Sequence, residues 1–143
     1  MTQNKIHEII LDETENQDVR EALWQGIKAF NKDYFGERTN QHFSLTIRDK
    51  NAKIIAGLNG FIFLDHARVG LTWIDERYRR QGMGRKLFKR LEEYCRSKGC
   101  RVIQLDTFDF QAPLFYEKMG FEYIGTVSEW TCGHDCHFMR KLL

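Results

Sequence analysis

The sequence predicts an α/β domain in which helices flank a mixed β-sheet. Two long segments carry apolar residues at every third or fourth position, the period of an amphipathic helix. Several shorter segments alternate apolar with polar residues, which is typical of half-buried strands. Because helical and extended segments alternate along the chain, we expect one sheet with helices packed on its faces.

Length and composition are those of one globular domain. The chain has 143 residues, of which 42% are hydrophobic and 29% charged, and these values exclude a disordered tail. No apolar run approaches the ~18 residues of a membrane-spanning helix, and the N-terminus lacks the basic-then-apolar pattern of a signal peptide. With Pro113 as the single proline and no Gly- or Ser-rich linker, we expect one domain over residues 1–143, cytoplasmic and without a membrane partner.

The first half of the chain is predicted to hold one helix and four strands. Val19, Leu23 and Ile27 begin an apolar series at helical spacing that continues to Tyr34. Gly36 is a suitable end for this helix. The predicted strands are Lys5–Leu11, His42–Arg48, Lys53–Leu64 and Ala67–Ile74.

The second half opens with the clearest helix of the chain. Met83, Leu87 and Leu91 lie on one face of it, and Gly99 ends it. A shorter helix has Pro113 near its first turn and a glycine at its end, which is the usual asymmetry of helix termini. The predicted elements are a helix over Gly82–Lys98, a strand over Arg101–Thr107, a helix over Pro113–Gly120 and a closing hairpin of Phe121–Trp130 with His137–Leu143.

The four cysteines are interpreted as reduced thiols. A chain of this size with its own core and no export signal does not need disulfides at Cys95, Cys100, Cys132 or Cys136. The last two flank His134 in a stretch that superficially resembles a zinc site. Neither the spacing nor the missing second ligand pair matches a common zinc module. We therefore predict a polar turn there and assign no metal ligands, with a metal site as the alternative.

Positive charge is concentrated in one short segment. The net charge is only +2, which is too small to indicate a nucleic-acid partner. Between Arg77 and Arg90, however, seven residues are basic and none is acidic. Such a block is often a solvated helix face, but here it coincides with glycines.

The glycines lie where a predicted strand leads into the long helix. A helix start presents unpaired backbone N–H groups and about half a positive charge. Gly82 and Gly84 remove side chains at that start, so a phosphate can approach the amides. Arg79, Arg80 and Arg85 add positive charge around the same opening. The segment is a candidate pyrophosphate site, and it matches neither the P-loop nor the dinucleotide fingerprint.

Two segments carry recognisable motifs. Residues 79–84, RRQGMG, match an Arg/Gln-x-x-Gly-x-Gly/Ala pattern, and residues 114–121, LFYEKMGF, are similar to Leu-Tyr-x-Lys-x-Gly-Phe. Together and in this order they resemble the motifs of GNAT-superfamily N-acetyltransferases. The resemblance implies a splayed, mostly antiparallel mixed sheet of about seven strands, and acetyl-CoA as the co-substrate.

The resemblance also implies where acetyl-CoA binds. In this family the co-substrate enters where two parallel strands separate, here those predicted over Ala67–Ile74 and Arg101–Thr107. The first strand's end pairs with the pantetheine arm, and the amides after it hold the pyrophosphate. An Asn that contacts the arm in many members is replaced here by Asp109, which, when ionised, can only accept hydrogen bonds. The implied cofactor-binding residues are Thr72, Trp73, Ile74, Arg79, Arg80, Gln81, Gly82, Met83, Gly84, Arg85 and Asp109.

The implied reaction is direct transfer, in which an amine attacks the thioester while both substrates are bound. The resemblance assigns the general acid to Tyr116, since a tyrosine with a pKa of about 10 is protonated at neutral pH. Gln104 stands where protein N-terminal acetyltransferases carry a glutamate base. An amine that binds in its neutral form needs no base. The candidates for a base are Asp65, His66, His134, Asp135 and His137.

The expected acceptor is a small, cationic primary amine. The family builds its acceptor groove from the first helix, the loop after it and the closing hairpin. Alternatives are a protein N-terminus or lysine as acceptor, a longer acyl group, or a non-catalytic acyl-CoA-binding regulatory module. Dimers are common among small enzymes, and a homodimer stays open. The acceptor-side candidates are Trp24, Tyr34, Phe35, Phe108, Phe110 and Trp130, with the acids Glu37, Asp109 and Glu129.

Overall fold

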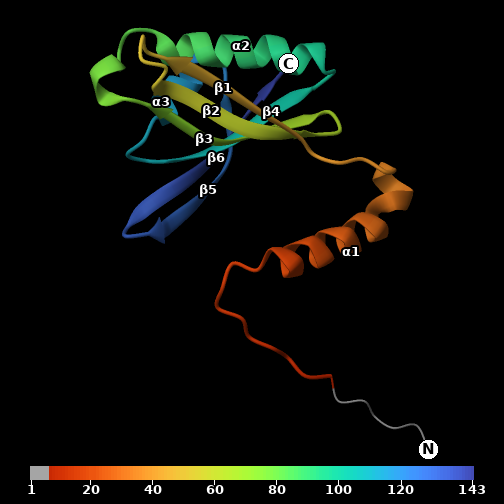
Figure 1. Cartoon of the computed structure of the whole chain (residues 1–143). Coiled ribbons are helices and arrows are strands. Elements are labelled where there is room, and N and C mark those ends of the chain that lie inside the picture. Colours follow the sequence, from red (N-terminus) through yellow and green to blue (C-terminus); the bar gives the residue numbers. More distant parts are fainter. Residues whose placement is uncertain (1–6) are drawn as a thin grey trace, which may run out of the picture. The chain divides into compact units, whose positions relative to one another are not determined.

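The computed structural model describes residues 7–143. It divides the chain into two compact units, residues 1–37 and residues 38–143, and each is considered by itself (Figure 1). The elements in chain order are α1 (Gln17–Phe35), β1 (Gln41–Arg48), β2 (Ile54–Phe63), β3 (His66–Ile74), the 3-10 helix η1 (Glu76–Tyr78), α2 (Met83–Ser97), β4 (Val102–Phe108), α3 (Pro113–Lys118), β5 (Glu122–Thr131) and β6 (His134–Leu142).

Helix α1 lies in the first unit, and its apolar period predicts it. The side chain of Asn16 caps its start by accepting a hydrogen bond from the backbone N–H of Val19 at 3.1 Å. Gly36, at φ 72°, ends it, and its N–H donates to the carbonyl of Lys32 at 2.8 Å. None of the helix residues is buried.

The predicted strand Lys5–Leu11 is wrong where the structure describes it. Residues 7–11 have no strand conformation, and the side chains of Ile9 and Leu11 are exposed. The rest of that prediction lies outside the described residues. A strand exists only when a neighbour supplies the other half of its hydrogen-bond ladder, and apolar residues alone do not provide one. The described sheet therefore has six strands and not about seven.

The second unit is built on this six-stranded sheet, in the order β1-β2-β3-β4-β6-β5. Among the described strands β3 and β4 form the one parallel pair, and the other neighbours are antiparallel. The mixed, mostly antiparallel sheet is thus confirmed. The predicted strands and hairpin of this unit are present, with ends shifted by up to three residues.

Helix α2 covers one face of the sheet and supplies the centre of the core (Figure 1). Phe88 and Leu91 of α2 are fully buried in one cluster with Ala67, Ile103 and Met139 of the sheet. This is the apolar face that the spacing of the helix predicts. None of the described helices is long and apolar enough to cross a membrane.

Candidate active site

Strands β3 and β4 begin side by side and then separate. They pair only where His66–Arg68 lie opposite Val102–Gln104. Beyond that, β3 continues to Ile74 on its other neighbour β2, and β4 continues to Phe108 on β6. The backbone groups that face each other beyond the paired segment are therefore not bonded to one another. The parallel strands split toward their carboxyl ends, as the family resemblance implies.

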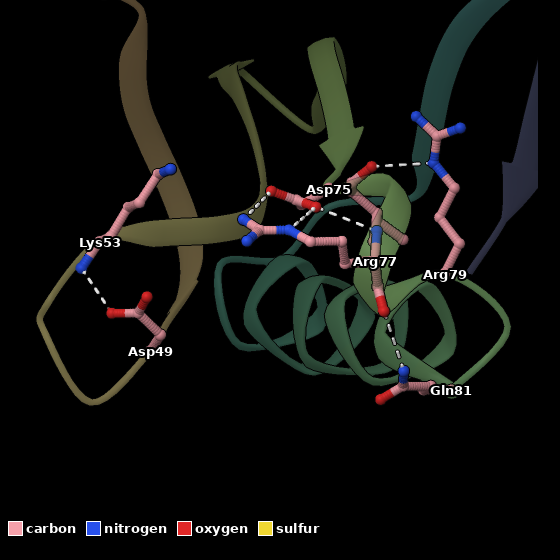
Figure 2. A network of polar contacts seen from close by, with 7 residues as sticks. Asp49, Lys53, Asp75, Arg77, Arg79 and Gln81 are labelled. Atoms are coloured by element: carbon pink, nitrogen blue, oxygen red, sulfur yellow. Dashed lines mark hydrogen bonds and ion pairs between the residues drawn. The ribbon is translucent and has the colours of Figure 1, made fainter.

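A network of polar contacts shapes the loop that leaves β3 (Figure 2). The carboxylate of Asp75 accepts from Nε of Arg77 at 3.0 Å and from Nη2 at 2.8 Å, and it also accepts from the Arg77 backbone N–H. The contacts with Arg77 lower the pKa of Asp75 from 3.8 to about 2. The N–H of Asp75 donates to the carbonyl of Ile55 at 2.8 Å. The loop is thereby anchored to β2.

Two of the predicted cofactor-binding side chains also hold this loop. Nε of Arg79 donates to the carbonyl of Ile74 at 3.0 Å, and Nε2 of Gln81 donates to the carbonyl of Arg77 at 3.2 Å (Figure 2). Arg80 and Arg85 make no ion pair within the described part of the chain. Both guanidinium groups are therefore available to an anion, whereas that of Arg79 is engaged through Nε.

The start of α2 keeps its amides unpaired within the helix. The first helical bond runs from the N–H of Lys86 to the carbonyl of Gly82 at 3.1 Å, so the three N–H groups before it have no intrahelical partner. Gly82 precedes the helix at φ 79° and offers no side-chain cap, and the first turn carries no acidic residue. This arrangement suits a bound anion.

Position 84 lacks a side chain because of a close packing contact that the sequence alone did not show. A β-carbon at this position would lie 3.0 Å from Cζ of Phe115 and 3.4 Å from Cδ1 of Ile74. The residue therefore allows α2 to pack closely on α3 and on the end of β3.

The side chain of Tyr116 is buried and reaches the β3 side of the split. Burial raises its pKa, and an interaction with the side chain of Thr72 on β3 opposes this in part. The ring of Phe88 on α2 packs edge-on against the rings of Phe115, Tyr116 and Phe121, at centroid distances of 5.8, 5.4 and 5.9 Å. Tertiary packing thus brings Thr72 and Tyr116 together.

Asp109 joins the loop after β4 to the hairpin of β5 and β6. One of its carboxylate oxygens lies 2.8 Å from Nδ1 of His134, and the other accepts from the N–H of Asp135 at 3.1 Å. The bond from Asp135, followed by that from His134, lowers the pKa of Asp109. The ring of His134 also packs edge-on against Phe110 at 4.7 Å. No sequence spacing indicated this pair, because its members come from separate elements.

Two of the candidates for the base lie at the closed end of the split, where β3 and β4 are still paired. Asp65 pairs with Nε of Arg101, and this contact lowers its pKa. Nε2 of His66 lies 3.0 Å from Oε1 of Gln104, in the segment where β3 and β4 are still paired. These residues stand at the end of the strands opposite to the unpaired backbone.

Two further candidates for the base, Asp135 and His137, belong to the hairpin of β5 and β6. Asp135 accepts a hydrogen bond from the N–H of Glu129 at 2.9 Å. Nδ1 of His137 lies 2.8 Å from the hydroxyl of Thr126 on the neighbouring strand. Both side chains therefore stabilise the hairpin.

The cysteine-containing segment predicted as a polar turn is only in part a turn, because residues 134–136 already belong to β6. Cys132 and Gly133 have φ values of 50° and 74° and connect β5 with β6. Cys132 is exposed and Cys136 is buried, and both are free thiols. Among residues 7–143 no group of three His, Cys, Asp or Glu side chains is arranged to hold a metal ion.

The structure brings some of the acceptor-side candidates together. Phe108 and Phe110 stack with ring centroids 5.7 Å apart and planes 5° from parallel, and Trp130 packs against Phe138 at 6.3 Å. The candidates that belong to the first unit are Trp24, Tyr34, Phe35 and Glu37.

A sheet that splits between two parallel strands, with a helix start of unpaired amides after the first strand and a buried tyrosine next to that strand, is typical of a CoA-dependent acyltransferase. The family model "Acetyltransferase (GNAT) family" matches residues 4–121. The chain belongs to this family, and its co-substrate is acetyl-CoA.

Individual relatives agree with this assignment. An acetyltransferase of Agrobacterium fabrum is 28% identical over 132 residues, which cover 92% of this chain and 96% of the relative. The blasticidin-S acetyltransferase of Streptomyces morookaense is 32% identical over 95 residues, 66% of this chain and 70% of the relative. The crystal structure of an acetyltransferase from Bacillus cereus superposes with a TM-score of 0.83 at 31% identity, over 95% of this chain and 98% of the other.

Proposed function

We propose that this acetyltransferase transfers the acetyl group directly to a primary amine of a small, cationic molecule, with Tyr116 as the general acid. The observation that supports this most is the buried Tyr116, whose side chain interacts with Thr72 beside the split and whose pKa is raised. A phenol with a raised pKa stays protonated at neutral pH. It is therefore able to protonate the leaving thiolate.

The pantetheine arm would pair with the β3 backbone at Thr72, Trp73 and Ile74. The carbonyl of Ile74 already accepts from Arg79, which favours the two preceding residues for this pairing. The arm can also approach Asp109, whose carboxylate retains lone pairs for an amide donor.

The pyrophosphate would bind at the start of α2, on the amides of Met83, Gly84 and Arg85. The unpaired N–H groups and the left-handed Gly82 support this placement. Arg80 and Arg85 would contribute charge, since neither is engaged by a carboxylate of the described residues. In this arrangement Arg79 and Gln81 act by holding the loop in shape.

Two relatives support a small-molecule acceptor. One is the blasticidin-S acetyltransferase, and the other is the glucosamine 6-phosphate N-acetyltransferase of Trypanosoma brucei brucei, 46% identical over 48 residues that cover 34% of this chain and 32% of the relative. Both names give a small molecule as the acceptor. In this chain Asp109 lies between Phe108 and Phe110 in the sequence, and the rings of these two residues stack on each other. Aromatic faces next to a carboxylate favour a cation.

Tyr116→Phe tests the proposed acid, with the exposed Tyr123→Phe as the matched control. Release of free CoA thiol is measured with acetyl-CoA and blasticidin S, glucosamine 6-phosphate, spermidine, an N-terminal peptide and a lysine peptide. We expect turnover with a small amine, a loss of about 100-fold in kcat for Tyr116→Phe and no loss for Tyr123→Phe. Acetyl-CoA should still raise the melting temperature of both variants.

The other outcomes identify the competing functions. Turnover with the peptides alone would indicate a protein acetyltransferase. Stabilisation by acetyl-CoA without thiol release for any amine would indicate a non-catalytic acyl-CoA-binding module. Equal turnover by the wild type and Tyr116→Phe would show that another group protonates the thiolate.

A further inference from the structure

We infer that His134, held by Asp109, is the general base that takes a proton from the acceptor ammonium. This inference rests on the proposed function and adds to it the residue that makes the amine nucleophilic. The two residues form a hydrogen-bonded pair at the open end of the split. The resemblance assigns Asp109 to the pantetheine arm, and no sequence motif links it to His134.

The hydrogen bond determines which nitrogen of His134 carries the proton. Bonds from Asp135 and His134 lower the pKa of Asp109, so its carboxylate is ionised at neutral pH and can only accept. Nδ1 of His134, 2.8 Å away, must therefore be the protonated nitrogen of the neutral ring. Nε2 then presents a lone pair, and it has no partner among residues 7–143.

Several contacts keep this imidazole in place. Asp109 makes two hydrogen bonds with Asp135 of the hairpin. Its N–H donates to the carbonyl of Asp135, and its carboxylate accepts from the N–H of Asp135, each at 3.1 Å. The edge-on contact with Phe110 restrains the ring from a second side. The side chain of His134 is nevertheless 44% exposed. A base that is oriented by the protein and accessible to a small amine meets the geometric requirement for proton transfer.

Its location agrees with this role. Asp109 directly follows β4, and His134 is the first residue of β6, which pairs with β4. Both residues therefore lie at the carboxyl end of β4, the end toward which the split opens. His66 lies at the closed end, bonded to Gln104, and His137 is bonded to Thr126 and packed on Tyr123 at 5.3 Å.

The reaction balances with these two residues and no further reagent. Nε2 of His134 takes one proton from the ammonium group, and the freed nitrogen lone pair attacks the thioester carbonyl carbon. The C–N bond forms and the C–S bond breaks, and the sulfur takes the hydroxyl proton of Tyr116. The new amide nitrogen gives its surplus proton to the phenolate, and His134 releases its proton to solvent. Ammonium and acetyl-CoA thus yield the amide, CoA thiol and one proton.

A pair of amines of matched shape separates base catalysis from a structural role. Ethylamine is protonated at neutral pH and needs a base, whereas trifluoroethylamine is largely neutral and does not. We expect His134→Gln to lower kcat/KM for ethylamine by about 100-fold and to leave the value for trifluoroethylamine nearly unchanged. His137→Gln, on the same strand, serves as the control and should alter neither value.

Asp109→Asn tests the positioning role of the carboxylate. The amide oxygen can keep the bond from the N–H of Asp135, while the amide nitrogen, now a donor, faces Nδ1 of His134 and forces the proton onto Nε2. We expect the same selective loss for ethylamine as in His134→Gln. Nitrogen-15 NMR of the imidazole should show the Nδ1–H form in the wild type and the Nε2–H form in Asp109→Asn.

Three results would overturn the assignment. These are an Nε2–H tautomer in the wild type, an equal loss for both amines in His134→Gln, or no loss for ethylamine. If Tyr116→Phe still lowers turnover of both amines in the last two cases, the proposed acetyl transfer stands without this base. If the wild type releases no CoA with either amine or with any amine tested above, the amine acceptor and the base assigned to it both fail.

Discussion

Gly84 on α2 and Phe115 on α3 approach so closely that a side chain at position 84 would displace the ring. A β-carbon there would lie 3.0 Å from Cζ and 3.3 Å from Cε2 of Phe115. Tyr116 directly follows Phe115. This contact therefore couples the helix start that we assign to the pyrophosphate with the helix that carries the proposed acid.

Gly84→Ala is expected to impair chemistry more than binding. The added methyl group overpacks the contact with Phe115, at a cost of about 1–3 kcal/mol, and the better helix propensity of Ala returns about 1 kcal/mol. Because the backbone N–H groups stay in place, we expect the KM for acetyl-CoA to change little. A shift of Tyr116 should lower kcat by about 10-fold, since small displacements of catalytic groups are costly. Steady-state kinetics with the best acceptor measure both values.

The double variant Gly84→Ala with Phe115→Leu checks the cause of that loss. A smaller side chain at position 115 leaves room for the methyl group, so the two changes should not be additive. Simple addition of the two single losses would contradict a direct steric contact.

Gly82→Ala is expected to destabilise the chain without any clash. Nothing lies within 4 Å of a β-carbon at this position, but its φ of +79° is left-handed, which costs about 1–2 kcal/mol for an L residue. We expect a lower free energy of unfolding and weaker acetyl-CoA binding, measured by denaturant unfolding and calorimetry.

The control is Gly125→Ala on β5, which also has open space but no positive φ. It should leave both quantities unchanged or slightly raise stability. An equal loss in the two variants would mean that the backbone at Gly82 is not the cause.

Arg80 and Arg85 are expected to contribute most of the side-chain charge at the pyrophosphate. Hydrogen bonds to charged groups are worth about 1.5–3 kcal/mol each, so either alanine variant should weaken acetyl-CoA binding by about 10-fold or more. The effect should diminish as salt rises, because screening weakens charge interactions. Lys89→Ala, from the same basic block but further along α2, should have little effect. A similar loss in all three variants would indicate general charge attraction.

The Asp75–Arg77 pair predicts a defined acid sensitivity. Arg77 lowers the pKa of Asp75 from 3.8 to about 2, so the folded state binds a proton less readily than the unfolded state. The stabilisation is present above a pH of about 4 and is lost as the pH falls toward about 2. The melting temperature of the wild type should therefore exceed that of Asp75→Asn at neutral pH, and this difference should disappear at the acid end. A constant difference across this range would show that the pair does not stabilise the fold.

The helices show how much of the fold local sequence can predict. The apolar period of α2 and the glycines and proline at helix ends placed α1, α2 and α3 within a few residues. The segment Lys5–Leu11 shows the limit. Its apolar residues resemble a strand, but no described strand pairs with residues 7–11, and pairing between distant segments is not a local property.

The residues of the site also fall into those that local sequence predicts and those contacts that it does not. The glycines and arginines of residues 79–85 and the position of Tyr116 could be found from motifs, because each acts within one short segment. The partners of these residues could not. Arg79 and Gln81 hold the loop, Gly84 makes room for Phe115, and Tyr116 meets Thr72, and each of these contacts depends on how the loop and its neighbouring elements pack.

The sequence by itself determined the alternation of helices and strands, the glycine-rich helix start proposed for the pyrophosphate and the resemblance to an acetyltransferase family. These features depend on residue spacing and on backbone preferences, which act over a few residues. Only the tertiary structure decided where β3 and β4 separate and which polar groups meet at the opening. The pair of Asp109 and His134 exists because the β4–β6 register brings the loop after one strand to the start of the other.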